Sequence, residues 1–251
     1  ALRDLPGKHY VTERAEMTAF QWAHEQFVAG RLAKMSKLAA LEELQKLYQH
    51  PRLVDPDASP TLTVAVAMSE SPKTALTMRI LDGIAQRGEK VLIFTHRLRM
   101  QDLLAQLIKM RYGLPRVRII NGDPNNRRHA LDFIKDFSTT RAFDVLVLNP
   151  ISAGMGLNIT AANHVIHYGR WWNPAKEDQA TDRAYRIGQT KEVYVYYPLL
   201  HPPGAPDRGF DVRLHALVEA KRSVARDFLA PVDDGELGVN DIRHIAREDH
   251  P

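Results

Sequence analysis

The chain has 251 residues, 44% of them hydrophobic, which is enough for one substantial core with an appendage. The absence of cysteine excludes disulfides and thiolate metal sites, and it fits a reducing compartment. A net charge of +4 permits nucleic-acid binding without demonstrating it. We expect no membrane partner, because no apolar run approaches the roughly 18 residues that span a bilayer. The chain begins with alanine, which indicates a piece of a larger protein.

The first 70 residues predict a helical element followed by a connector. The segment from residue 17 to residue 48 is rich in Ala, Leu, Glu, Gln and Lys, with apolar residues at near-helical intervals. It predicts two antiparallel helices interrupted near Gly30. His50 stands before a proline at a helix end, and we interpret it as structural rather than as a ligand. Residues 51–72 contain Pro51, Pro56, Pro60 and Pro72 with several Ser, Thr and Asp and predict a loop or connector, in which TLTVAVAM (61–68) predicts a short strand.

Helical and strand patterns alternate from residue 78 onward. Helices are expected at 78–84, 100–110 and 123–137, and strands at 91–95, 117–120, 145–148, 165–168 and 193–197. This alternation predicts right-handed βαβ units and a parallel sheet of at least five strands. A loop rich in proline follows, and then an amphipathic helix at 211–229. Its apolar side is expected to carry Leu214, Leu217, Val218 and Val224.

A loop of small residues follows the strand at 145–148 and contains Ser152, Ala153, Gly154 and Gly156. Backbone can approach a ligand closely where side chains are this small. Open parallel sheets bind ligands at the carboxyl ends of their strands, where this loop lies. Its amides suit a nucleotide on one side and a nucleic-acid phosphate on the other, while an ordinary tight turn is the alternative.

A second candidate site lies on the helix that follows. Asn173 is suited to cap this helix and Pro174 to occupy its first turn. Helical geometry continued to residue 186 would place Gln179, Arg183 and Arg186 within about 60° of one another. Arginine suits bidentate contacts with phosphate and can stabilise a phosphoryl-transfer transition state. The alternative is a solvated basic face with charge pairing along the helix.

Three strings together identify a family resemblance. GMGLNITAANHVI (154–166), WWNP (171–174) and QATDRAYRIGQTKEVYVY (179–196) resemble motifs V and VI of the Swi/Snf-type ATPases, a branch of the superfamily-two helicases. The resemblance extends upstream to LPGKH (5–9) and to residues 71–99. It implies the C-terminal RecA-like lobe of a DNA translocase, an α/β fold with a parallel sheet flanked by helices. The implied regions are a linker and helical protrusion (1–70), the motor lobe (71–200), and a brace helix with a tail (201–251).

The resemblance also implies roles for individual residues. Arg183 and Arg186 would be catalytic arginine fingers, with Gln179 beside them. Gly154, Gly156 and Asn158 would face the nucleotide. Contacts with the DNA backbone are implied for Thr95, His96, Arg97, Gly122, Arg128 and Ser152, and Trp172 would lie against the DNA groove.

Two positions depart from the family pattern. Ala153 replaces a usual glycine. The difference is one methyl group, so we expect it to change the loop only slightly. Gly169 replaces a usual acidic residue. We expect the neighbouring Arg170 to be less neutralised and to attract phosphate more strongly.

No phosphate loop of the form GxxxxGK[ST] is present, and no acidic metal-binding box follows a buried strand. The resemblance explains both absences, because a first lobe that precedes LPGKH carries these parts. ATP would lie between the lobes with Mg²⁺ held by the first, so this chain alone is expected to be inactive. No metal site is predicted here, since His164 and His167 would point to opposite faces of a strand.

The predicted function is therefore the second motor lobe of a DNA-dependent ATPase that moves on duplex DNA and remodels protein–DNA complexes. Its expected partners are duplex DNA, the N-terminal lobe of the same parent chain and a DNA-bound protein target. It would act in the bacterial cytoplasm on the nucleoid, or in the nucleus of a eukaryote. A non-catalytic interaction module that kept the fold is the alternative. A nucleotide-binding oxidoreductase is excluded, because no GxGxxG opens a helix after the first strand.

Overall fold

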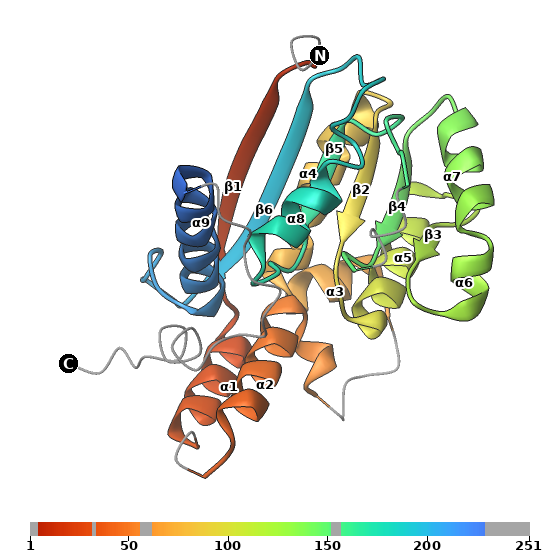
Figure 1. Cartoon of the computed structure of the whole chain (residues 1–251). Coiled ribbons are helices and arrows are strands. Elements are labelled where there is room, and N and C mark those ends of the chain that lie inside the picture. Colours follow the sequence, from red (N-terminus) through yellow and green to blue (C-terminus); the bar gives the residue numbers. More distant parts are fainter. Residues whose placement is uncertain (1–4, 32–33, 56–61, 152–156, 229–251) are drawn as a thin grey trace. The chain divides into compact units, whose positions relative to one another are not determined.

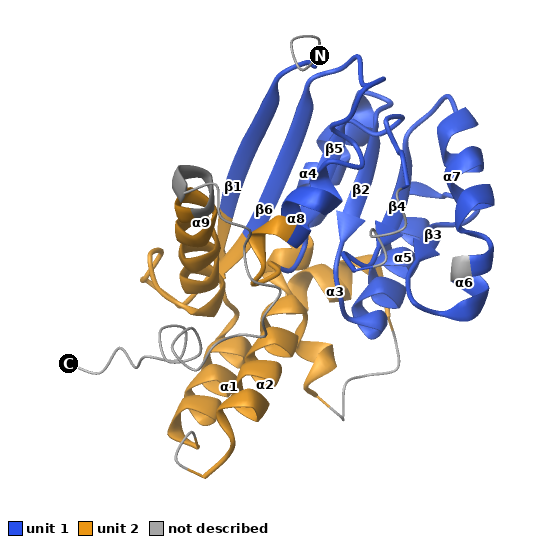
Figure 2. Cartoon of the chain, viewed as in Figure 1, with its two compact units in different colours: residues 1–13, 76–169, 176–198 blue, residues 14–75, 170–175, 199–251 orange. Residues whose placement is uncertain are grey.

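A computed structural model describes residues 5–31, 34–55, 62–151 and 157–228 (Figure 1). The chain forms two compact units that are interleaved along the sequence (Figure 2). The first unit comprises Ala1–Glu13, Leu76–Gly169 and Lys176–Pro198, and the second comprises the remaining residues. The domain boundaries expected at residues 70 and 200 stay a prediction. No helix within the described ranges is long and apolar enough to cross a membrane.

Six parallel strands form one sheet in the order β1-β6-β5-β2-β4-β3. The strands are β1 (Lys8–Glu16), β2 (Lys90–Phe94), β3 (Arg118–Ile120), β4 (Asp144–Leu148), β5 (His164–His167) and β6 (Val193–His201). Val91 of β2 pairs with Val145 on one side and with His164 on the other. The predicted parallel α/β sheet is confirmed, and β1 is a further strand at its edge.

The three central strands β2, β4 and β5 are short and buried along their whole length. Runs of this kind are typical of parallel strands covered on both faces. The connection from β2 to β3 and that from β3 to β4 run in opposite directions along the sheet. Right-handed crossovers therefore place their helices, α5 (Leu98–Tyr112) and α7 (Ala130–Thr139), on opposite faces. The first unit also contains α6 (Pro124–Arg128), most of α4 (Pro72–Gln86) and most of α8 (Pro174–Thr181).

The single helix expected at 123–137 is wrong in one respect, because the chain forms two helices, α6 and α7, that meet at His129. The Asp123 carboxylate caps the first by accepting hydrogen bonds from the amides of Asn125 and Asn126 at 2.9 and 3.2 Å. The loop that contains Gly122 is thereby tied to the first turn of α6.

The second unit opens with the two predicted helices, α1 (Ala19–Gly30) and α2 (Lys37–Gln49). Thr18 and Gln21 form a capping box at the start of α1. His50 is buried, and its Nδ1 accepts a hydrogen bond from the Arg52 amide at 3.2 Å in the short helix η1 (Pro51–Leu53). Its structural role is therefore confirmed.

The strand expected within 61–68 is wrong, since these residues enter the helix α3 (Val64–Glu70). Thr63 starts this helix, because its hydroxyl accepts a hydrogen bond from the Val66 amide at 3.2 Å. A local cap has overridden the strand preference of the valines.

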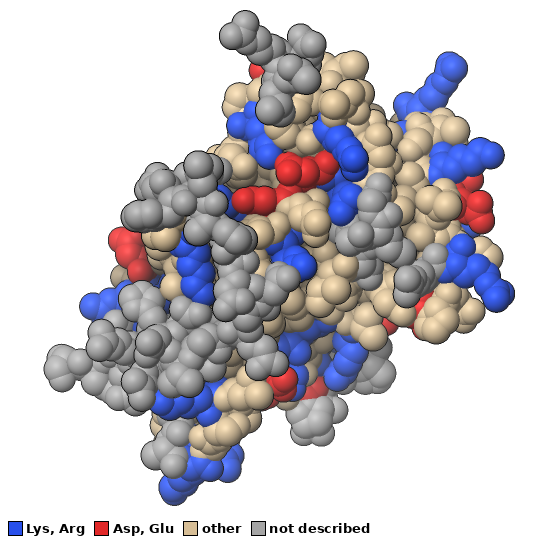
Figure 3. Space-filling view, in the orientation of Figure 1, with Lys and Arg blue, Asp and Glu red and all other residues tan. Residues whose placement is uncertain are grey.

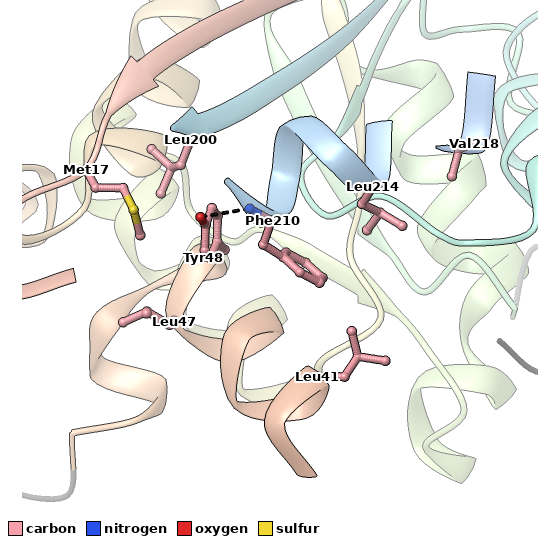
Figure 4. Close-up of a cluster of buried hydrophobic side chains, with 8 residues drawn as sticks. All are labelled: Met17, Leu41, Leu47, Tyr48, Leu200, Phe210, Leu214 and Val218. Carbon is pink, nitrogen blue, oxygen red and sulfur yellow. Dashed lines mark hydrogen bonds between the residues drawn. The ribbon is translucent and has the colours of Figure 1, made fainter. Parts of the chain in front are cut away.

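A hydrophobic cluster joins α2 to the helix α9 (Phe210–Phe228) in the second unit (Figure 4). The Tyr48 hydroxyl lies within it, accepting from the Phe210 amide at 2.9 Å and donating to Glu25 at 2.8 Å. The predicted C-terminal helix is confirmed, with Leu214 and Val218 buried in the cluster. Val224 does not share that side, because 57% of it is exposed.

Candidate functional site

The residues that follow β2, β3 and β4 form one hydrogen-bonded edge of the sheet. The Thr95 amide donates to the Leu148 carbonyl, and the Asn149 amide donates to the Ile120 carbonyl. Gln101 links two of these strand ends, because its Nε2 donates to the Thr95 carbonyl at 2.7 Å and its Oε1 accepts from Asn121 at 2.9 Å. The sequence motifs expected to bind ligand thus stand on a rigid edge, where parallel sheets bind ligands.

The first motif at this edge is only partly exposed. Thr95 is fully buried, while His96 and Arg97 are half-buried. Burial, followed by the nearby Arg97 guanidinium, lowers the pKa of His96 to about 4. Its imidazole is therefore neutral at pH 7 and would meet a phosphate as a hydrogen-bond donor, not as a cation. The DNA contacts expected for these three residues remain a prediction.

Gly122 and Arg128 are both exposed, at the two ends of the segment that enters and forms α6. The Asn121 side chain holds the start of this segment, because its Oδ1 accepts from the Asp123 amide at 2.9 Å. A phosphate could approach both positions from solvent. Their contact with DNA is likewise a prediction.

The helical stripe of Gln179, Arg183 and Arg186 does not form, because α8 ends at Thr181. Beyond it the hydrogen bonds are mixed, because the amides of Arg183 and Ala184 donate to carbonyls three residues earlier, whereas that of Tyr185 donates to Thr181, four residues earlier. We call residues 182–189 the arginine turn. Gln179 therefore lies exposed on α8, whereas both arginines lie in the turn.

Arg183 is buried, with 6% of the residue exposed. Its Nη1 donates to the Leu157 carbonyl at 3.3 Å, and its own carbonyl accepts from the Ile159 amide at 2.9 Å. Burial, followed by the charge of Arg186, lowers the pKa of Arg183. Within the described part of the chain, its Nε has no hydrogen-bond partner and its side chain forms no ion pair with a carboxylate.

Arg186 and Asn158 are exposed beside this buried guanidinium. The two hydrogen bonds of Arg183 bracket Asn158, so the arginine turn and residues 157–159 are held side by side. The structure thus brings together Arg183, Arg186 and Asn158, which the sequence assigned to a common site. Ser152, Gly154, Gly156 and Ala153 lie outside the described residues.

Trp172 belongs to the second unit, where it is partly buried against the hydrophobic cluster. Its ring stacks on that of Trp171, with 4.2 Å between the centroids. The Asn173 carboxamide accepts a hydrogen bond from the Ala175 amide at 2.9 Å, as expected at a helix start. A role of Trp172 at the DNA groove stays a prediction.

Arg170 is not the poorly neutralised cation that Gly169 suggested. Its side chain is 1% exposed and donates to the Glu219 carboxylate at 2.8 Å, beside a short contact with His215. Glu219 on α9 therefore supplies a negative charge that is absent at position 169. The expectation of stronger phosphate attraction at Arg170 is wrong.

A separate cavity of about 610 Å³ lies where β2 and β5 begin, away from the strand ends that carry the motifs. Glu89 is one of its lining residues and accepts from Arg87, Asn163 and Lys191 at 3.0–3.1 Å, with His164 Nε2 at 2.7 Å. These contacts hold the pKa of Glu89 down to about 2, although burial alone would raise it. The cavity is therefore lined by charges that are already paired.

The two histidines of β5 have different partners. His164 meets Glu89, whereas His167 Nε2 lies 2.8 Å from the Thr181 hydroxyl. Across the described ranges, no group of three or more His, Asp or Glu side chains is arranged to hold a metal ion.

Charged side chains of both signs are interspersed on the surface seen in Figure 3. A net charge of +4 over the chain is small, so it does not indicate a large basic surface for nucleic-acid binding. Phosphate recognition at this site would depend on individual cations such as Arg186.

Comparisons with known proteins agree with this description. Residues 72–188 match the family model of the helicase conserved C-terminal domain. The Zorya protein ZorD of Escherichia coli is 35% identical over 92% of this chain and 22% of that protein. The putative ATP-dependent helicase/translocase YwqA of Bacillus subtilis is also 35% identical, over 69% of this chain and 18% of that protein. The chain thus spans about a fifth of the length of these relatives.

Two solved structures from Sulfolobus solfataricus share the fold. The SWI2/SNF2 ATPase core in complex with dsDNA is 29% identical, with a TM-score of 0.69 over 97% of this chain and 51% of that chain. The C-terminal domain of the SWI2/SNF2 ATPase is 23% identical, with a TM-score of 0.66 over 95% and 97% of the two chains. The chain therefore belongs to the SWI2/SNF2-type ATPases, as a C-terminal lobe that contains a helicase C-terminal domain.

Proposed function

We propose that this chain is the second motor lobe of an ATPase that is stimulated by duplex DNA and translocates along it. The observation that carries the proposal is the arginine turn. It holds one buried guanidinium without a carboxylate partner among the described residues, next to an exposed one. Such a pair of cations suits an anion that comes from outside the chain, and phosphate oxygens match the donor geometry of arginine.

In this proposal the two arginines have different tasks. Arg183 is fixed by the Leu157 carbonyl and contributes a static positive field, while exposed Arg186 reaches the transferring phosphoryl group. Asn158 would face the nucleotide beside them, and Gln179, which is exposed on α8, would orient groups at the edge of the site. ATP with Mg²⁺ would supply the phosphoryl group, with the metal held by carboxylates of a first lobe.

The strand ends that Gln101 links would present His96, Arg97 and the exposed Gly122 and Arg128 to DNA phosphates. Contacts of this kind position a protein on DNA without reading its sequence. The S. solfataricus core supports this partner, since it was solved in complex with dsDNA, and the name of YwqA, a putative ATP-dependent helicase/translocase, supports translocation. Remodelling of a DNA-bound protein, on the nucleoid or in chromatin, is part of the same proposal.

The test is the ATPase rate of the full-length protein, with and without duplex DNA, for the wild type and for Arg186→Ala. Removal of an arginine finger should lower the rate by on the order of 10³-fold. DNA stimulation that is lost in Arg186→Ala supports the motor. A rate that is indifferent to both would instead favour a non-catalytic interaction module.

The isolated chain provides a second test. It should not hydrolyse ATP, because the phosphate loop and the magnesium carboxylates are absent from its sequence. Hydrolysis by the purified chain that disappears in Arg186→Ala would contradict the proposed division of labour between two lobes.

A further inference from the structure

Lys8, in the first strand of the sheet, contacts the arginine turn across 174 positions of sequence. Its Nζ donates to the Asp182 carboxylate at 3.0 Å and lies 4.2 Å from the centre of the Tyr185 ring. Both partners belong to the turn that carries Arg183 and Arg186. One ammonium group thus holds an anion and an aromatic ring that flank the first of the two arginines.

The Asp182 carboxylate is a potential competitor for the arginines. It is adjacent to Arg183 in sequence, and its charge raises the pKa of that guanidinium against the effect of burial. It stands four residues before Arg186, in a turn where the Tyr185 amide still donates to the carbonyl four residues earlier. Without a fixed counter-ion, a carboxylate in this position would form an ion pair with a neighbouring arginine.

We propose that Lys8 is a positioning residue that occupies Asp182 and thereby keeps Arg186 available for phosphate. Its contact with the Tyr185 ring adds a cation–π interaction, which holds the residue immediately before Arg186. Among the described residues, the Arg186 side chain makes no hydrogen bond and no ion pair, and only its carbonyl accepts one, from the Gln189 amide. This inference rests on the proposed function of Arg186 as a finger.

The arrangement is suited to positioning and contributes little to stability. The Lys8 and Asp182 side chains are 20% and 54% exposed, and ion pairs with that much solvent contact contribute little to folding. A loss of catalysis without a loss of stability would therefore point to the competition between cations for Asp182.

The test uses the full-length protein with saturating duplex DNA and compares kcat and KM for ATP among single and double variants. Lys8→Ala should lower kcat about fivefold. An exposed ion pair between Arg186 and Asp182 would be stable by up to about 1 kcal/mol, so about one molecule in five would keep Arg186 free for phosphate. Asp182→Asn should remain within about twofold of the wild type, and Lys8→Ala with Asp182→Asn should return to that level. Lys8→Arg should be nearly as active as the wild type, since a guanidinium can pair with Asp182 and stack on Tyr185. Lys109→Ala, which removes an exposed lysine on α5, is the matched control.

The double variant decides between positioning and plain structure. If Lys8 only braces the fold, removing the Asp182 charge cannot rescue Lys8→Ala, and the double variant will be as slow as the single one. That result, or a full kcat in Lys8→Ala, would overturn the inference. An inactive Arg186→Ala beside a fully active Lys8→Ala would leave the proposed function intact. If Arg186→Ala is fully active, both proposals fail.

Discussion

Arg183 should make the folded chain less stable than an apolar residue of similar length would. The residue is 6% exposed, and within the described residues its guanidinium forms one hydrogen bond, at 3.3 Å to a carbonyl, while its Nε has no partner. Desolvation of a cation costs several kcal/mol, and one hydrogen bond to a charged group returns only about 1.5–3 kcal/mol. Arg183→Met keeps most of the packing and removes the charge. We expect its free energy of unfolding to rise by about 1 kcal/mol.

Urea denaturation of this chain at pH 7 measures the effect, with equal m-values as evidence that the unfolded states are comparable. Arg186→Met is the matched control, because that side chain is exposed and its replacement should change stability by less than about 0.5 kcal/mol. A decrease of more than about 1 kcal/mol in Arg183→Met would refute the reasoning. It would mean that the guanidinium is paired well enough to stabilise the fold.

Two further predictions concern ion pairs elsewhere in the chain. Glu89→Gln should lower stability at pH 7 by about 3 kcal/mol at most, since the pKa of Glu89 falls from 4.5 to about 2 on folding. A carboxyl whose pKa is depressed stabilises the fold above pH 4.5 and loses that contribution as the pH falls toward 2, so urea titrations should show the two proteins converging in acid. In the second unit, Lys73→Met should lower the free energy of unfolding by about 3–5 kcal/mol. It removes the ammonium group that lies 2.5 Å from the buried Asp211 carboxylate and leaves that charge without its cation. Adding Asp211→Leu should restore most of that loss, and thermal unfolding of the three proteins checks it.

The sheet could be predicted from the sequence because its central strands are short apolar runs that are buried on both faces. Apolar runs did not predict β1, because its residues are only exposed or half-buried and include several charges. The prediction also failed at residues 61–68, where the Thr63 cap outweighs the preference of the valines for strands. The periodicity of apolar residues predicts elements that are buried. It does not predict a helix that is started by a single capping hydrogen bond, or an edge strand with few buried residues.

The candidate site could be predicted only as a set of residue types. Asn158, Arg183 and Arg186 do lie together, but no Gly or Pro marks the end of α8 at Thr181, so the sequence predicted a stripe where a turn occurs. Gln101 and Lys8 act through contacts with residues that are distant in sequence or on other elements. Spacing within one element gives no signal for contacts of this kind.

The arginine turn is stabilised by hydrogen bonds of Gln189, its last residue, and not by ion pairs of its arginines. The Gln189 carboxamide is buried, its Nε2 donates to three backbone carbonyls, and its Oε1 accepts from two amides. These bonds stabilise the turn without neutralising either arginine, and Lys8 occupies its acidic residue at the other end. A turn that served packing alone would gain from an apolar residue at position 183 and from an ion pair at Arg186. Among the described residues, neutral hydrogen bonds stabilise the turn and neither arginine side chain pairs with a carboxylate, which is the property that the proposed phosphate-binding role requires.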